Sequence, residues 1–231
     1  MPWIAEENFN DYAEDSEITA VAGQGTGWSG DWIEDIASTW TADTTDALEG
    51  KSATIDTNVG SNFRDIHRVL TTPVTTGIVQ FAVRKTDAAV ISFKLMSGAT
   101  EIIAMQFNTA EALALIGATS ENIATGLSAL TWYYIQINFD QVADTFKGRQ
   151  GTDGVNWSAY TATVAGQAAW TSLDRVYLQT NATAVGNVWL DDIKNGETAA
   201  PSRLTATGRL VATGRLTATG RLTATGRLSN T

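Results

Sequence analysis

The sequence predicts an all-β protein, an antiparallel jelly-roll β-sandwich followed by an extended stalk of β-repeats. Through most of the 231 residues, short β-rich runs alternate with Gly, Asn, Asp and Thr breaks, and the chain contains only three prolines. Ile135, Ile137 and Phe139 alternate with Gln136 and Asn138, which is typical of a strand with one face in water. About ten such strands without a helical period indicate two packed antiparallel sheets.

The clearest expected strands share β-branched and aromatic residues bounded by turn-forming ones. They comprise residues 77–85, 90–96, 101–107, 132–139, 145–150, 175–179 and 187–193. Residues 109–130 are ambiguous, because the apolar run 112–116 suits either a short helix or buried strands. We expect strands there.

The last thirty residues, 202–231, repeat Arg-Leu-Thr-Ala-Thr-Gly almost unchanged with a period of six. Six is a multiple of two but not of 3.6, so each repeat places Leu, Ala and Gly on one side of an extended chain and Thr, Thr and Arg on the other. The leucines of the apolar side are Leu204, Leu210, Leu216, Leu222 and Leu228.

This apolar side is too small to form a core within one chain, because a hexapeptide solenoid needs roughly three coils of about three repeats each. Several copies sharing the repeats would solve the problem, and we expect a homotrimeric stalk joined through these leucines. Other oligomers and a flexible low-complexity linker are the alternatives. The predicted domains are therefore residues 1–197, the jelly roll, and residues 198–231, the oligomerisation stalk.

Charge is distributed unevenly along the chain. Five of the 15 basic residues lie in the repeats and none of the 25 acidic ones do, which leaves residues 1–197 with ten bases against 25 acids, or −15. An acidic body does not suit nucleic acid, which binds basic surfaces. The absence of cysteine excludes disulfides and thiolate metal sites. The sequence begins without a secretory signal and contains no apolar run of membrane-spanning length, so we expect synthesis in a host cytoplasm and no membrane partner.

Four segments resemble the concanavalin A-like, or laminin-G-like, jelly-roll family. They are Glu-Asn-Phe-Asn-Asp-Tyr at 7–12, Gly-Thr-Gly-Trp-Ser-Gly-Asp-Trp at 25–32, Trp-Tyr-Tyr-Ile-Gln-Ile at 132–137 and Val-Trp-Leu-Asp-Asp-Ile at 188–193. The resemblance covers about residues 6–194 and implies the fold, which hosts lectins, hydrolases and inert structural modules alike. Domains with this opening and short β-repeat tails look like virion proteins of tailed bacteriophages.

The sequence does not predict an enzyme. Glucanases of the resembled family carry Glu-x-Asp-x-Glu or Glu-x-Asp-x-x-Glu on one strand, and this chain has no such run. The adjacent pairs 34–35 and 191–192 would point to opposite faces of a strand. His67, the single histidine, has no nucleophile motif beside it, so a structural role is expected.

Asp191 is a candidate calcium ligand. Alternation along the strand places its carboxylate on the same side as Trp189. A carboxylate buried there without a cation or hydrogen-bond donor would be costly. In similar carbohydrate-binding jelly rolls, calcium joins the last strand to the first, which implies Asp11, Asn10 or Glu7 as co-ligands here. The alternative is a structural Asp191 that accepts hydrogen bonds from backbone amides of the first strand.

Three tryptophans in or beside loops, Trp28, Trp32 and Trp157, are candidates for stacking on a glycan. A core position is the alternative for each, above all for the first two, which lie in a glycine-rich segment.

Two functions fit these observations. The first is a structural virion protein of a bacteriophage, a trimeric head fibre, decoration or spike protein that contacts capsid or tail proteins and assembles through its repeats. The second is a carbohydrate-binding module of a receptor-recognition or bacterial surface protein, with a cell-surface glycan as its partner.

Overall fold

The computed structural model describes residues 3–21, 24–36, 39–56, 64–86, 89–180 and 186–196, together with the backbone of 204–206 and 222–224. Pro2–Glu197 forms one compact unit and Thr198–Thr231 belongs to a second. Besides strands, the described residues include a short 3-10 helix, η1 (Ile18–Ala20). No helix in these ranges is long and apolar enough to span a membrane.

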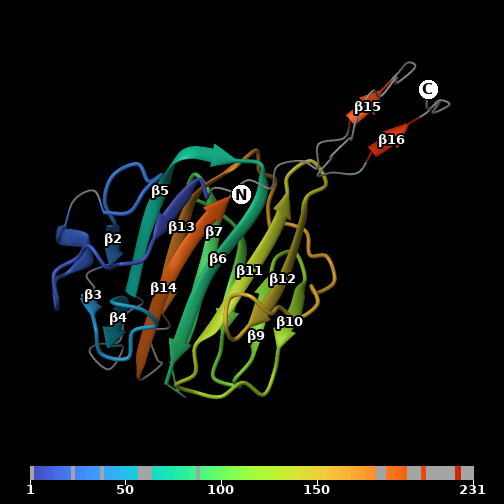
Figure 1. The fold of residues 1–231 in the computed structure, drawn as a ribbon. Coiled ribbons are helices and arrows are strands. Elements are labelled where there is room, and N and C mark those ends of the chain that lie inside the picture. Colours follow the sequence, from blue (N-terminus) through green and yellow to red (C-terminus); the bar gives the residue numbers. More distant parts are fainter. Residues whose placement is uncertain are drawn as a thin grey trace, which may run out of the picture. The chain divides into compact units, whose positions relative to one another are not determined.

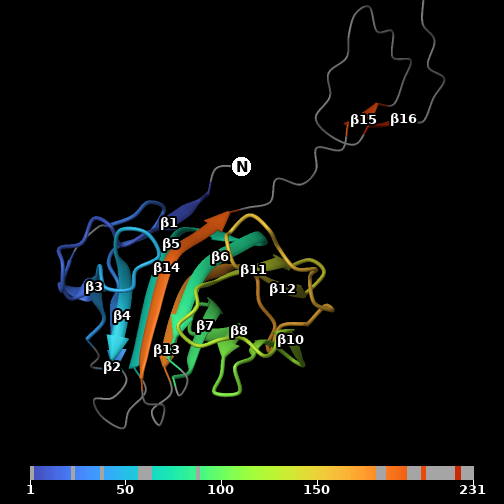
Figure 2. The same cartoon turned by 60° about the horizontal axis from the view of Figure 1, so that its bottom comes forward.

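The compact unit is a two-sheet antiparallel β-sandwich, which confirms the all-β expectation (Figures 1 and 2). The first sheet has the order β12-β11-β6-β14-β4-β3, with β1 paired to β14. Its strands are β1 (Ala5–Glu7), β3 (Thr41–Asp43), β4 (Ser52–Asp56), β6 (Thr76–Lys85), β11 (Tyr133–Asp140), β12 (Thr145–Gly151) and β14 (Asn187–Gly196).

The second sheet has the order β10-β9-β8-β7-β13-β5-β2. Its strands are β2 (Ile33–Ile36), β5 (Arg64–Val74), β7 (Ile91–Ser97), β8 (Thr100–Phe107), β9 (Leu113–Ile116), β10 (Ser120–Ala124) and β13 (Leu173–Thr180). The ambiguous segment 109–130 therefore contains two strands, as expected.

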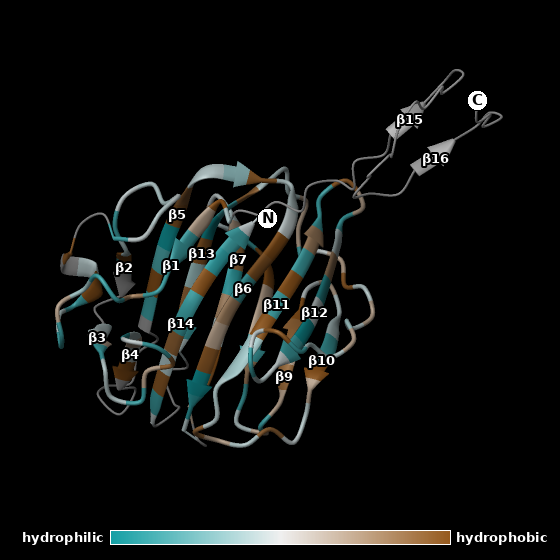
Figure 3. Cartoon of the chain, viewed as in Figure 1, coloured by the Kyte–Doolittle hydropathy of each residue, from teal (hydrophilic) through white to brown (hydrophobic). Residues whose placement is uncertain are grey.

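Hydrophilic and hydrophobic residues alternate along strands of the sandwich (Figure 3), and this alternation decides which face of each sheet is buried. On β11, Ile135 and Ile137 are fully buried against the second sheet, and Gln136 between them lies on the opposite face. Gln136 is only 7% exposed, because Gln80 and Arg149 cover it, so this position is not in water, contrary to what the alternation predicted. Phe81 of β6 and Phe93 of β7 stack across the two sheets with ring centroids 3.9 Å apart. Such contacts between the inner faces stabilise the sandwich through apolar burial.

A buried ion pair ties the N-terminal strand to the second sheet. The Arg68 guanidinium on β5 contacts the Glu7 carboxylate at the end of β1, and both side chains are 1% exposed. The same guanidinium donates hydrogen bonds to the backbone carbonyls of Gln24 and Gly30. The pair therefore holds the loop around residues 24–30 as well as β1.

The C-terminal repeats are described only as backbone in two short strands, β15 (Leu204–Ala206) and β16 (Leu222–Ala224). These pair in parallel, with Leu204 opposite Leu222. Leu210, Leu216 and Leu228 lie outside the described residues, and so do the side chains on which the trimeric stalk depends. The stalk stays a prediction from the sequence.

Candidate functional site

Four side chains on the outward face of the first sheet form a continuous hydrogen-bonded row, called here the polar row: Arg149, Gln136, Gln80 and Asp192. They come from four neighbouring strands, β12, β11, β6 and β14. Register brings them together, because Gln136 lies directly opposite both Arg149 and Gln80. The row exists because each strand presents a polar residue at the same level of the outward face.

Hydrogen bonds fix the direction of every group in the polar row. Arg149 donates from Nε and Nη2 to Gln136 Oε1 at 2.8 and 2.6 Å. Gln136 Nε2 donates to Gln80 Oε1 at 2.9 Å, and Gln80 Nε2 donates to Asp192 Oδ2 at 3.4 Å. Lys194 closes the row by pairing with Asp192 Oδ1 at 2.5 Å.

Aromatic rings flank the row at its β12 end. The Arg149 guanidinium carbon lies 4.3 Å from the ring centroid of Tyr160 and 5.1 Å from that of Trp157. Both rings are partly exposed. A guanidinium against aromatic faces is held rigidly and costs little further entropy when a ligand binds.

At the other end of the row, β14 contains a bulge. Asp191 lies opposite Ala82 and Lys194 lies opposite Gln80, so two residues of β14 face one of β6, and Asp192 has a positive φ of 52°. The expectation that Asp191 and Asp192 point to opposite faces is wrong, because the bulge breaks the alternation. Both residues line one pocket on the outward side.

The pocket has a volume of about 410 Å³ and joins the polar row through Asp192. Strands β1, β11 and β14, the loops after β1 and β3 and the segment between η1 and β2 supply its walls. Most of its lining residues are acidic or carry amides; the lining comprises Glu6, Glu7, Asn8, Asn10, Asp11, Gly25, Thr26, Leu48, Glu49, Tyr134, Asp191, Asp192 and Lys194.

Asp191 is the acid of this pocket whose pKa is raised most. Its side chain is buried, with the residue 2% exposed, and its Oδ1 accepts a hydrogen bond from the Asp192 amide at 2.7 Å. Burial raises the pKa of Asp191 from 3.8 to about 7, and the nearby charges of Asp192 and Glu49 add to that rise. Backbone hydrogen bonds from Asp192 and Glu49 oppose it only in part.

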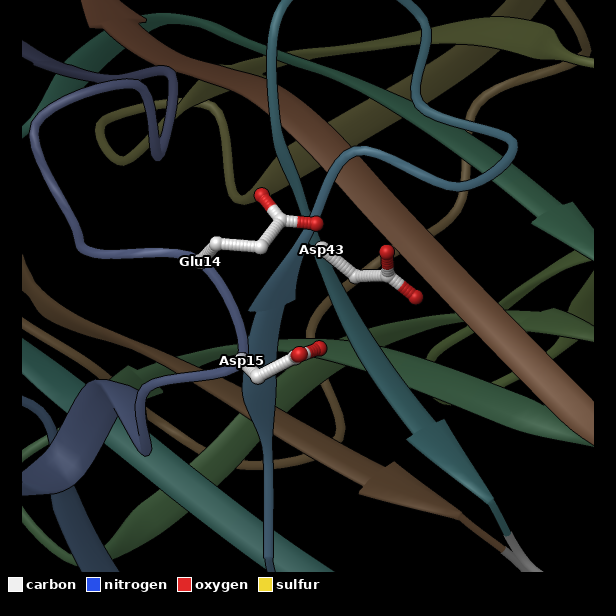
Figure 4. Close-up of side chains that lie close together, drawn as sticks. All are labelled: Glu14, Asp15 and Asp43. Carbon is white, nitrogen blue, oxygen red and sulfur yellow. The ribbon is translucent and has the colours of Figure 1, made fainter.

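The residues implied as calcium ligands all reach this pocket, since Asp11, Asn10, Glu7 and Asp191 are among its lining. Glu7, however, already accepts hydrogen bonds from the Phe9 amide and Tyr12 hydroxyl besides its contact with Arg68. Within the described ranges, three carboxylates converge within 4.8 Å only elsewhere, at Glu14, Asp15 and Asp43 (Figure 4). That second cluster is largely exposed, and Glu14 is engaged by the Thr44 amide and hydroxyl.

Calcium at Asp191 has a direct thermal test. If Asp191 and Asp11 bind calcium, EDTA should lower the melting temperature and added calcium should restore it, because a ligand that binds only the folded state stabilises it. The Asp191→Asn variant should show a smaller response. An unchanged melting temperature in EDTA would leave Asp191 with its backbone hydrogen bonds alone.

The three glycan candidates lie in different environments. Trp32 is 2% exposed and packs against Phe9 in the core, which leaves no ring face for a sugar. Trp28 packs at a tilt against Trp32, lies under the Arg68 guanidinium and donates a hydrogen bond from Nε1 to the Glu6 carbonyl, so its contacts are structural. Trp157 is the candidate that lies on the outward face, next to Arg149.

Sequence reasoning did not identify Gln80, Arg149, Tyr160 or Lys194 as site residues. The sequence indicated these residues only weakly. Alternation predicted that Gln136 faces outward, and Arg149 lies opposite it on the next strand. Which outward residues meet depends on strand order, which the sequence does not reveal.

No protein-family model matches the sequence, and no curated protein matches it. Solved structures do resemble the chain. The catalytic domain of the glycoside hydrolase family 131 protein from Coprinopsis cinerea superposes with a TM-score of 0.63 at 13% identity, covering 86% of this chain and 96% of that one. A Lotus tetragonolobus seed lectin gives 0.51 at 10% identity, covering 82% and 96%.

A sialidase gives a TM-score of 0.58 at 9% identity; the match covers 86% of this chain but only 19% of the sialidase. At such identities the likeness shows the fold alone. The sandwich of this protein has the concanavalin A-like fold of lectins and glycanases.

Proposed function

We propose that this protein binds a carbohydrate on the outward face of its first sheet. The observation that carries the proposal is the polar row with its aromatic end, where Arg149 is held between Gln136 and the rings of Trp157 and Tyr160. Sugars present hydroxyl groups around a ring whose C–H faces are apolar. A site with fixed hydrogen-bonding groups beside partly exposed aromatic rings complements both features.

The structural neighbours support this choice, since they include a lectin, a sialidase and a glycoside hydrolase. The proposal requires binding only, and we keep the expectation that the chain is not an enzyme. Incubation with a bound glycan should therefore release no new reducing ends.

Binding can be measured on a glycan array and then quantified by calorimetry with the tightest glycan. Arg149→Ala and Trp157→Ala should each weaken that affinity by about tenfold or more, because loss of an anchoring aromatic or Arg contact typically costs over 1 kcal/mol. Arg175→Ala on β13 of the second sheet makes the same change of residue type away from the row and should keep the parent affinity. Equal effects of Arg149→Ala and Arg175→Ala would contradict the assignment of the face, and no bound glycan would contradict the function.

The structural virion protein remains a separate proposal that rests on the C-terminal repeats and the family resemblance. It predicts a trimer, which the mass of the purified particle in solution measures. The two proposals are compatible, because a fibre that displays three glycan-binding sandwiches would gain avidity from its valency.

A further inference from the structure

We propose that the pocket beside the polar row is a subsite for a positively charged sugar residue, an amino sugar that is not acetylated. This proposal rests on the glycan binding proposed above and specifies the ligand of one part of that site. The pocket joins the row at Asp192, so a glycan lying along the row would reach it without leaving the face.

The pocket is strongly acidic. Six of its lining residues carry carboxyl groups, and Lys194 is its one base. Arg68 pairs with Glu7 and Lys194 pairs with Asp192. The other four, Glu6, Asp11, Glu49 and Asp191, form no ion pair within the described part of the chain. The negative charges of Glu6, Asp11 and Glu49 favour a cation and oppose an acidic sugar, and a bound cation would also favour the ionised form of Asp191.

Asp191 supplies a specific attachment point within this field. The Asp192 amide donates to its Oδ1, and the Glu49 amide also favours the ionised carboxylate, but its fully buried Oδ2 has no hydrogen-bond donor within normal distance among the described residues. A buried acceptor without a donor is costly, and a ligand N–H or O–H group would remove that cost. The residue lines the pocket, so such a donor can reach it from there.

The dimensions favour a sugar over a bare metal ion. About 410 Å³ is far more than one ion needs, and the pocket carboxylates do not gather in threes within 4.8 Å as those of Glu14, Asp15 and Asp43 do. Spread acceptors suit a ligand that carries several separated donors. An amino sugar has three ammonium N–H groups and several hydroxyls, and its positive charge matches the acidic lining.

Binding of three oligosaccharides tests whether the pocket recognises the ligand's positive charge or only its shape. They are the hexamers of chitosan, chitin and cellulose. Their β-1,4-linked rings differ in the group at C2, which is an amine, an acetamide or a hydroxyl. With the full chain in EDTA at slightly acidic pH, where the amine is protonated, the chitosan hexamer should bind about tenfold tighter than the other two. Asp191→Asn and Glu49→Gln should each reduce this preference several-fold. Glu49→Gln removes a negative charge from the lining, and Asp191→Asn removes the carboxyl group that would give up its proton and ionise against the bound ammonium group.

Glu14→Gln is the matched control, since it removes one negative charge outside the pocket and should retain the tenfold preference. Equal affinity for all three hexamers, or a preference that survives Asp191→Asn and Glu49→Gln unchanged, would overturn the amino-sugar subsite. So would binding of none of them. In that last case, a different glycan on the array whose affinity depends on Arg149 would still support the proposed function, so the two failures are distinguishable.

Discussion

Replacing Glu7 with Gln should lower the free energy of unfolding by about 3–5 kcal/mol, because it leaves the Arg68 guanidinium buried without its counter-charge. Both side chains are 1% exposed, so water cannot replace the lost partner. Burial raises the pKa of Glu7, while the Phe9 amide and Arg68 counter that rise. Urea denaturation of the parent and the variant measures the loss.

Glu6→Gln is the control, because this neighbouring side chain is exposed and should change stability by no more than about 0.5 kcal/mol. A double variant, Glu7→Leu with Arg68→Met, should lose less than the two single changes together, since removing both charges leaves neither one unpaired. If Glu7→Gln and Glu6→Gln were equally mild, the ion pair would not anchor β1 to the second sheet.

Asp191 should make the sandwich lose stability as pH rises. Its pKa is about 7 in the folded state against 3.8 for the unperturbed group, so the folded state holds the proton more tightly than the unfolded chain does. The stabilisation from the protonated group is fully present below about pH 4 and is lost as pH rises through about 7. A shift of about three units corresponds to roughly 4 kcal/mol across that window.

Asp191→Asn removes the titrating group, so the pH-dependent loss should be smaller in this variant and its gain over the parent should grow from about pH 4 to pH 7. Urea denaturation in EDTA at several pH values measures this difference. Asp153→Asn serves as the control, because the pKa of this exposed residue is lowered and its titration falls below the window. Parallel curves for the parent and Asp191→Asn would show that Asp191 titrates at its ordinary pKa.

The fold class was readable from the sequence because strands obey a local rule. Alternation along residues 132–139 identified β11 and its two faces, and turn residues placed most strands from β6 to β14 within a few positions. The β-rich run of residues 109–130 likewise formed β9 and β10. The strands before β6, including the eleven-residue β5, were not identified. Arg68, a charged residue at an inward position of β5, illustrates why, since its burial depends on Glu7 sixty-one residues away.

The candidate site was decided by tertiary structure. The polar row exists only because β12, β11, β6 and β14, of which only β11 and β12 are consecutive in sequence, are neighbours in the sheet. The period of two that identifies strands also predicts that adjacent residues point apart, and for Asp191 and Asp192 that inference failed at the bulge. The sequence by itself determined the sandwich, through local periodicity. Strand order and one irregularity, both products of non-local packing, determined where its acidic and aromatic groups meet.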